Sequence, residues 1–226
     1  SYFQAKYMDR DDAVRQGLLT IIGSEIDKKY LDKVQTLSIQ PDIIREVADT
    51  FTLIYTPLHG TGNKPVRSIL NRIGLKNVIV VKEQENPDPS FSTVKSPNPE
   101  EHDAFKIAIR MAKEKNVDVI IGTDPDCDRV GVVVKDRKGE YNVLTGNQTG
   151  CLLLHYILSQ KKATGTLPIN GVVVKTIVTT EMARAIAQSY DTEIEDVLTG
   201  FKFIGEKIQG YEETGSKEYL FGFEES

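Results

Sequence analysis

The sequence predicts an α/β protein of two small three-layer α/β/α domains, with mixed, largely parallel sheets and an N-terminal helical lead-in. Short apolar runs rich in Val and Ile alternate along the chain with segments of helical periodicity. This succession is typical of parallel sheets covered by helices. The alternation pauses near residues 144–147 and then restarts. We therefore expect a helical lead-in at 1–40 and two domains, at 41–145 and 146–226.

The lead-in and the first domain follow from the spacing of apolar residues. Residues 9–37 have helical periodicity and predict one or two helices, and Pro41 stands where a further helix over 42–49 would begin. Strands are predicted at 51–55, 78–81 and 117–122, a hairpin at 130–135 and 141–144, and helices at 65–73 and 100–115. The segment 83–99 carries four prolines, and a loop of this length in a compact domain is often functional.

The second domain repeats the alternation on a smaller scale. Apolar, β-branched runs predict strands at 172–174, 194–197 and 219–221, and periodic segments predict helices at 149–158, 181–189 and 203–210. Helices between successive strands favour a parallel sheet.

Composition excludes several classes of protein. The chain has 39% hydrophobic and 27% charged residues, a net charge of -5 and a pI near 5.4, so it lacks the basic patch of a nucleic-acid binder. No apolar run approaches the roughly 20 residues that span a bilayer, so we expect no membrane partner. Cys127 and Cys151 form no C-x-x-C motif and are predicted to be free thiols. The first residues do not resemble a secretory signal, and we expect a cytoplasmic protein.

Three alternating aspartates form the most informative motif. Asp124, Asp126 and Asp128 follow an apolar strand, and ligand sites of α/β sheets gather at the carboxyl ends of strands. Three close carboxylates repel one another unless a cation lies among them, and an oxygen-only set suits Mg²⁺. An acidic surface turn is the alternative. An EF-hand is excluded, because Arg129 and Lys135 occupy the positions that require Gly and Glu.

Several segments, in order along the chain, resemble the α-D-phosphohexomutases, the family of bacterial phosphoglucomutases and phosphomannomutases. T-D-P-D-C-D-R at 123–129 is similar to the family's metal loop, and G-F-E-E-S at 222–226 to its sugar-recognition loop. Y-T-P-L-H-G-T-G at 55–62, the stretch 81–101 and G-F-K-F-I-G at 200–205 also resemble family segments. Nothing here is similar to the family's catalytic serine loop, T-A-S-H-N-P, or to its fourth-domain phosphate loop, R-x-S-G-T-E-P. The resemblance therefore implies domains two and three, without domains one and four of the same polypeptide.

The resemblance implies an intramolecular phosphotransferase of carbohydrate metabolism. Members of the family move a phosphoryl group between the 1- and 6-positions of a hexose through a bisphosphate, using an enzyme phosphoserine. For the parent protein this implies interconversion of glucose 1-phosphate and glucose 6-phosphate, with a hexose phosphate as substrate and Mg²⁺ as cofactor. The chain by itself is expected to be inactive.

Residue roles follow from the same resemblance. The three aspartates would hold Mg²⁺, and Arg129 would contact phosphoryl oxygens, a salt bridge to its own aspartates being the alternative. Glu224 and Ser226 would bind sugar hydroxyls, whereas Glu225 fits a solvated acidic turn. His59 fits either loop positioning near the metal or a hydrogen-bonded structural role.

Two lysines complete the set of implied catalytic residues. Lys175 resembles a lysine near the reacting oxygen, and its alternative is a solvated lysine at a strand end. Lys202 would approach the phosphate or the sugar. Some family members have His where this chain has Phe201, so the general acid and base stay open.

Other functions remain open at this point. Within the family these are phosphomannomutase and phosphopentomutase. Outside it, a metal-dependent phosphatase would use Asp124 as nucleophile, although Asp128 departs from the pattern of such loops. A third possibility is a non-catalytic module that binds sugar phosphates.

Overall fold

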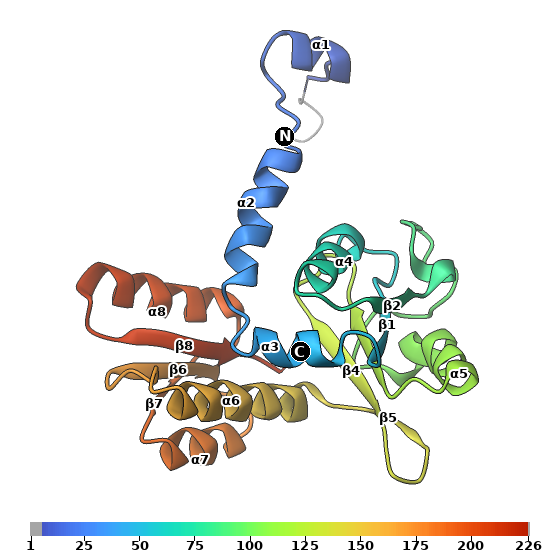
Figure 1. The fold of residues 1–226 in the computed structure, drawn as a ribbon. Helices are drawn as coiled ribbons and strands as arrows, with labels where there is room; N and C mark the ends of the chain where they lie inside the picture. Colours follow the sequence, from blue (N-terminus) through green and yellow to red (C-terminus); the bar gives the residue numbers. More distant parts are fainter. Residues whose placement is uncertain (1–5, 226) are drawn as a thin grey trace. The chain divides into compact units, whose positions relative to one another are not determined.

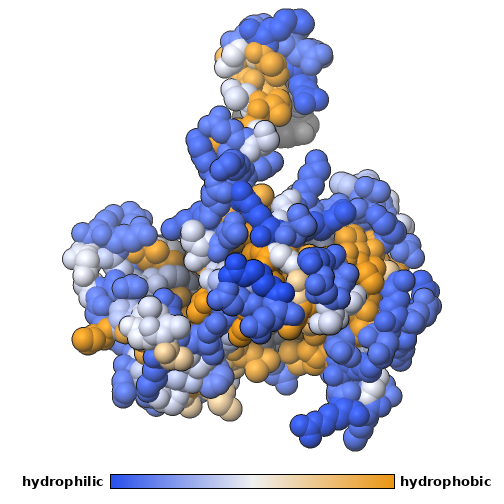
Figure 2. All heavy atoms as spheres, in the orientation of Figure 1, coloured by the Kyte–Doolittle hydropathy of each residue, from blue (hydrophilic) through white to orange (hydrophobic). Residues whose placement is uncertain are grey.

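The computed structural model describes residues 6–225, which divide into two compact units. The first ends at Leu37 and contains α1 (Arg10–Arg15) and α2 (Ser24–Gln35), so the periodic stretch 9–37 forms two helices. Asp9 begins α1, since its carboxylate accepts backbone N–H groups of the first turn. No residue of either helix is buried, and apolar side chains are visible as orange spheres near α1 in Figure 2. These helices therefore gain little stability from packing within their own unit.

The second unit begins at Ser38 and contains two sheets (Figure 1). Sheet A is formed, in spatial order, by β2 (Asn77–Val80), β1 (Thr52–Thr56), β3 (Val119–Thr123), β4 (Val130–Lys135) and β5 (Tyr141–Val143). β1 pairs in parallel with β2 and β3, whereas β4 is antiparallel to both β3 and β5. The predicted hairpin is thus confirmed, and sheet A is mixed.

Helices and 3₁₀ turns precede and connect the strands of sheet A along the chain. They are α3 (Pro41–Val47), α4 (Asn63–Arg72), η2 (Lys82–Gln84), η3 (His102–Phe105) and α5 (Lys106–Lys115). α5 packs on one face of the sheet, where its alanines and the fully buried Phe105 of η3 belong to the same hydrophobic core as Ile54 and Ile120. The predicted start of this helix at residue 100 was wrong. The Asn98 side chain accepts the N–H of Glu100 and holds a turn there instead.

Sheet B has three parallel strands among the described residues, in the order β7 (Glu193–Val197), β6 (Gly171–Thr176) and β8 (Glu218–Phe223). Val173 packs against α6 (Gly146–Ala163) and α7 (Met182–Ser189) on one face. Val172 and Val174 pack against α8 (Phe201–Thr214) on the other (Figure 1). Side chains of successive residues in a strand point to opposite faces, which explains this division. The predicted α/β/α layering is confirmed.

Helix α6 is longer than the sequence predicted, and its start bears on the site. The Thr145 hydroxyl accepts the N–H of Gln148, while the Gln148 side chain accepts the N–H of Thr145. This reciprocal pair is a capping box, and it begins the helix at Gly146, three residues earlier than expected.

Candidate active site

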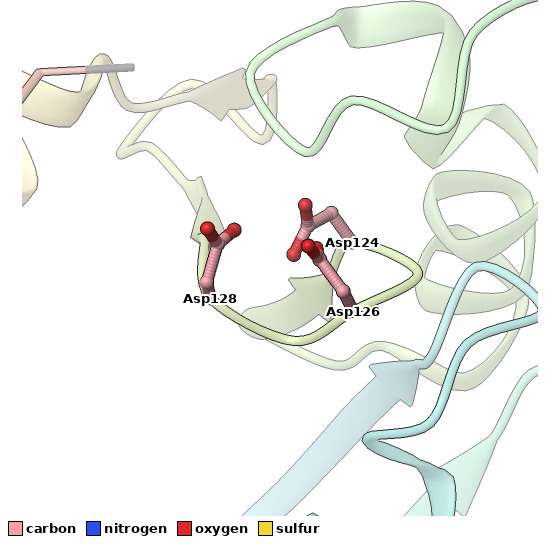
Figure 3. A group of neighbouring side chains, drawn as sticks. All are labelled: Asp124, Asp126 and Asp128. Atoms are coloured by element: carbon pink, nitrogen blue, oxygen red, sulfur yellow. The ribbon is translucent and has the colours of Figure 1, made fainter. Parts of the chain in front are cut away.

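The aspartate loop (residues 124–129) joins β3 to β4 in a tight turn. Thr123 and Val130 pair across the ends of the two strands, and the N–H of Cys127 donates to the carbonyl of Asp124 at 3.1 Å. Cys127 adopts a left-handed conformation with φ 66°. This turn points the alternating aspartates inward, and Figure 3 shows the Asp124 and Asp126 carboxylates together, with Asp128 facing them across the bend.

The three aspartates converge in the way that a cation site requires. One carboxylate oxygen from each of Asp124, Asp126 and Asp128 lies within 4.8 Å of the others. Carboxylate oxygens are hard donors of the kind that Mg²⁺ prefers, and the exposure of Asp126 and Asp128 leaves room for water or phosphate ligands. The donor set therefore fits Mg²⁺.

The loop shifts the pKa values of two of its aspartates in opposite directions. Asp124 is 1% exposed, and burial by itself would raise its pKa. Hydrogen bonds from the backbone and side chain of Arg129 outweigh burial and hold the pKa below its ordinary value. The pKa of Asp126 is raised, first by its hydrogen bond with Asp124 and then by the charges of Asp124 and Asp128. A bound cation would relieve this repulsion.

Arg129 lies at the base of the loop and also reaches open space. Its Nε and Nη2 both lie 2.9 Å from Oδ2 of Asp124, and its N–H donates to Oδ1 at 3.1 Å. The salt bridge that was the alternative interpretation of Arg129 is therefore present. The side chain is nevertheless 41% exposed and lines a cavity.

This cavity, of about 670 Å³, brings two distant sequence motifs together. Asp128 and Arg129 line it from the aspartate loop, and Glu224 lines it from the glutamate loop (residues 222–225), which begins with the last two residues of β8. The remaining wall comes from Glu100, Val130, Gly146, Thr149, Gly150, Leu153, Phe201 and the end of β8. A ligand in this space could contact a guanidinium at one side and a carboxylate at the other.

Glu224 and Glu225 are held by different partners. The Glu224 carboxylate accepts the N–H of Gly200 at 2.7 Å. Glu225 is partly buried, its carboxylate accepts the side-chain amide of Asn147, and its N–H lies 3.4 Å from the Thr179 hydroxyl. Interpreting Glu225 as a solvated turn was therefore wrong. Sequence reasoning missed Asn147, whose signal was its place inside the capping box at the start of α6.

The predicted lysines lie outside the cavity lining. Lys175 is in β6 with no exposed surface, and its ammonium contacts Glu181 at 2.9 Å and Asp196 at 3.1 Å and donates to the Thr179 carbonyl at 3.1 Å. The alternative of a solvated lysine is wrong. Lys202 is exposed on α8 and lies over the Phe203 ring. Ser226 lies outside the described residues.

Two family models match the chain. The model of phosphoglucomutase/phosphomannomutase alpha/beta/alpha domain II covers residues 28–139, and that of domain III covers 145–226. The chain belongs to this family. The aspartate loop is thus a part of domain II and the glutamate loop a part of domain III, and the cavity lies where residues of both meet.

Individual phosphohexomutases agree with this assignment. Phosphoglucomutase of Staphylococcus epidermidis is 36% identical over 213 residues, which are 94% of this chain and 37% of that protein. A phosphomannomutase candidate from Thermus thermophilus has the same fold, with a TM-score of 0.64 at 21% identity over 89% of this chain and 41% of its own. N-acetylphosphoglucosamine mutase of Aspergillus fumigatus, solved with GlcNAc-6P and magnesium, has a TM-score of 0.56 at 15% identity over 81% and 37%.

This chain spans well under half the length of these relatives. Within residues 6–225, no helix has the length and apolar character that a membrane span requires.

Proposed function

We propose that this chain carries the metal site and the sugar-recognition site of a phosphoglucomutase, which interconverts glucose 1-phosphate and glucose 6-phosphate through a bisphosphate. The observation that supports this best is the cavity lined by both Arg129 and Glu224. A guanidinium fits the oxygens of a phosphoryl group, and a carboxylate accepts hydrogen bonds from neighbouring hydroxyls. A hexose phosphate carries both kinds of group.

The three aspartates of the aspartate loop are the residues that would hold Mg²⁺. Their converging oxygens support this, as does the presence of magnesium with a sugar phosphate in the Aspergillus relative. When bound, Mg²⁺ neutralises charge on phosphoryl oxygens. Asp124 also holds two nitrogens of the Arg129 side chain, and so orients it beside the cavity.

In this proposal the glutamate loop orients the sugar. Glu224 accepts from hydroxyls near the middle of the ring, which are available in both orientations that a 1- to 6-phosphoryl exchange requires, and Ser226 assists it. Lys202 follows the cavity-lining Phe201 and approaches the ligand from α8. Lys175 supports the glutamate loop indirectly: its ammonium is held by Glu181, Asp196 and the Thr179 carbonyl, and the Thr179 hydroxyl lies 3.4 Å from the N–H of Glu225.

Turnover needs more than these residues in our proposal. The phosphoserine and a second phosphate site would come from segments that correspond to the parts of the relatives outside the matched region. In this proposal the 226-residue chain therefore binds substrate without converting it. A phosphatase with Asp124 as nucleophile is disfavoured, because this side chain is 1% exposed and both its oxygens accept from Arg129. Phosphomannomutase is the second candidate, since the matching family includes both activities.

Calorimetric titration of the chain with glucose 1-phosphate and with mannose 1-phosphate, in saturating Mg²⁺, tests the proposal. We expect the glucose ester to bind more tightly and Glu224→Gln to weaken it about 10- to 100-fold, because a charge-assisted hydrogen bond is worth roughly 1.5–3 kcal/mol. The exposed Glu218→Gln is the matched control. Unchanged affinity in Glu224→Gln would contradict the role of the glutamate loop, and conversion by the pure chain would contradict the need for other parts.

A further inference from the structure

A second loop contacts the aspartate loop through its backbone. This loop, the clamp loop (residues 57–62), joins β1 to α4. The N–H of Thr61 donates to the carbonyl of Pro125 at 2.8 Å, and the Thr61 hydroxyl lies 3.2 Å from the same oxygen. A methyl group at Gly60 would lie 2.5 Å from the Cα of Pro125 and 2.7 Å from its carbonyl oxygen. The two backbones therefore approach as closely as they do only because residue 60 is a glycine.

Gly62 makes the second contact, at the start of α4. A methyl group there would lie 2.7 Å from the Sγ of Cys127 and 2.8 Å from the hydroxyl of Tyr55. The Tyr55 hydroxyl is in turn 2.8 Å from the hydroxyl of Thr123, the last residue of β3. The lack of a side chain at Gly62 thus leaves room for Cys127, the residue whose left-handed conformation makes the turn between the aspartates.

The clamp loop has an unusual backbone, and a histidine holds it in place. Leu58 and His59 both adopt positive φ angles, 45° and 65°, which side-chain-bearing residues do at a cost. The His59 ring is buried, with Nδ1 2.8 Å from the carbonyl oxygen of Asn86 and Nε2 2.8 Å from the hydroxyl of Thr93. Both partners belong to the proline-containing loop 83–99.

A buried network of amide and hydroxyl groups continues from there into the sheet. Gln84 has no exposed surface. Its side-chain oxygen accepts a hydrogen bond from the Thr56 hydroxyl at 2.6 Å, and its side-chain nitrogen donates to the Thr93 hydroxyl at 3.2 Å. The Gln84 carbonyl accepts the N–H of His59, and the Thr56 hydroxyl accepts the N–H of Leu58 at 3.2 Å. Buried hydrogen bonds that satisfy one another make a loop rigid.

We infer that the clamp loop, locked by His59 to the loop 83–99, positions the aspartate loop and thereby sets its affinity for Mg²⁺. The inference rests on the proposed Mg²⁺ site. Gly60 and His59 make no hydrogen bond to the carboxylates of Asp124, Asp126 and Asp128, and they act through the backbone of Pro125 and the turn at Cys127. The long loop and the Y-T-P-L-H-G-T-G motif, to which the proposed function gives no task, act together as the support of the metal site.

The experiment compares Gly60→Ala with Gly205→Ala in the 226-residue chain, because a methyl group at Gly205 in α8 would meet no atom within 4 Å other than its chain neighbours and the backbone of its own helix. Calorimetry with Mg²⁺ alone should show affinity lowered about 10- to 100-fold in Gly60→Ala, as is usual when the support of a metal ligand is lost, and unchanged in Gly205→Ala. Hydrogen exchange should show faster exchange of the backbone amides of residues 124–129 in Gly60→Ala only.

His59→Asn provides an independent variant if Gly60→Ala does not fold. Asn tolerates the left-handed conformation but its shorter side chain cannot reach both partners of the imidazole, so we expect the same changes. Wild-type Mg²⁺ affinity and exchange of residues 124–129 in both variants, with only the melting temperature lowered, would overturn the inference. If the wild-type chain binds no Mg²⁺ but Gly60→Ala still speeds exchange in residues 124–129, the clamp loop positions the aspartate loop and the proposed Mg²⁺ site is wrong.

Discussion

The carboxyl ends of the strands in sheets A and B are organised by different kinds of interaction. Beside sheet A, hydrogen bonds that involve no ion pair join Thr56, Gln84, Thr93 and His59. Beside sheet B, the fully buried Lys175 contacts Glu181 and Asp196, and Arg184 contacts both of the same carboxylates. The first edge positions a backbone, whereas the second depends on the balance of charges.

The difference extends to the loops that line the cavity. In the aspartate loop, Arg129 forms a salt bridge with Asp124. The backbone of this loop also accepts a hydrogen bond from the backbone of the clamp loop. The glutamate loop is held by side chains and backbone from other segments, through Asn147, Thr179 and Gly200. We therefore expect single substitutions to affect sheet B mainly through stability and the aspartate loop mainly through metal binding.

The largest effect on stability is expected from Lys175→Met. The change leaves Glu181 and Asp196 with Arg184 as their remaining cationic partner. Breaking a buried ion pair costs roughly 3–5 kcal/mol. Because these carboxylates are partly solvated, we expect the free energy of unfolding to fall by about 2–4 kcal/mol. Urea unfolding followed by circular dichroism measures it. The exposed Lys202→Met is the control, expected to stay within about 0.5 kcal/mol. Equal losses in the two variants would mean that the charged network contributes nothing.

A smaller effect, of opposite sign with and without metal, is expected from Asp126→Asn. The pKa of Asp126 is raised in the fold by Asp124 and Asp128, so the ionised carboxylate destabilises the metal-free fold above that pKa. At about pH 7 the amide should raise the melting temperature without Mg²⁺, yet lower Mg²⁺ affinity at least about tenfold. Thermal unfolding with and without Mg²⁺ checks both, with the exposed Asp118→Asn as control. A lower melting temperature without metal would contradict the repulsion inferred among the aspartates.

The smallest effect concerns Glu195, on β7. Burial would raise its pKa, but ion pairs with Lys207 and Lys217 lower it from 4.5 to about 2. A carboxylate with a lowered folded pKa contributes stability above its unfolded pKa and loses it as the pH falls towards the folded value.

Glu195→Gln should therefore lower the melting temperature at about pH 7 and make the decline between about pH 4.5 and 2 shallower. A series of melting temperatures across this range tests the prediction, with the exposed Glu212→Gln as control. Coinciding profiles for Glu195→Gln and the wild type would show that these ion pairs do not stabilise sheet B.

Much of the fold and the metal loop could be predicted from the sequence, because both depend on interactions over short distances along the chain. Val172, Val173 and Val174 predicted a buried strand, and the structure buries all three. The alternation of Asp124, Asp126 and Asp128 predicted convergence, and one turn between two paired strands produces it. The periods of strands and helices are local properties of the backbone.

Other features were decided by residues far apart in sequence. Asn147 meets Glu225, 78 positions away, and Tyr55 meets Thr123, 68 positions away. Lys175 follows three valines and looks like a strand-end charge in the sequence. Only the packing of α7 and β7 beside β6 encloses it and supplies Glu181 and Asp196. Burial and partnership of a polar group depend on which elements pack together, and that is a property of the tertiary structure alone.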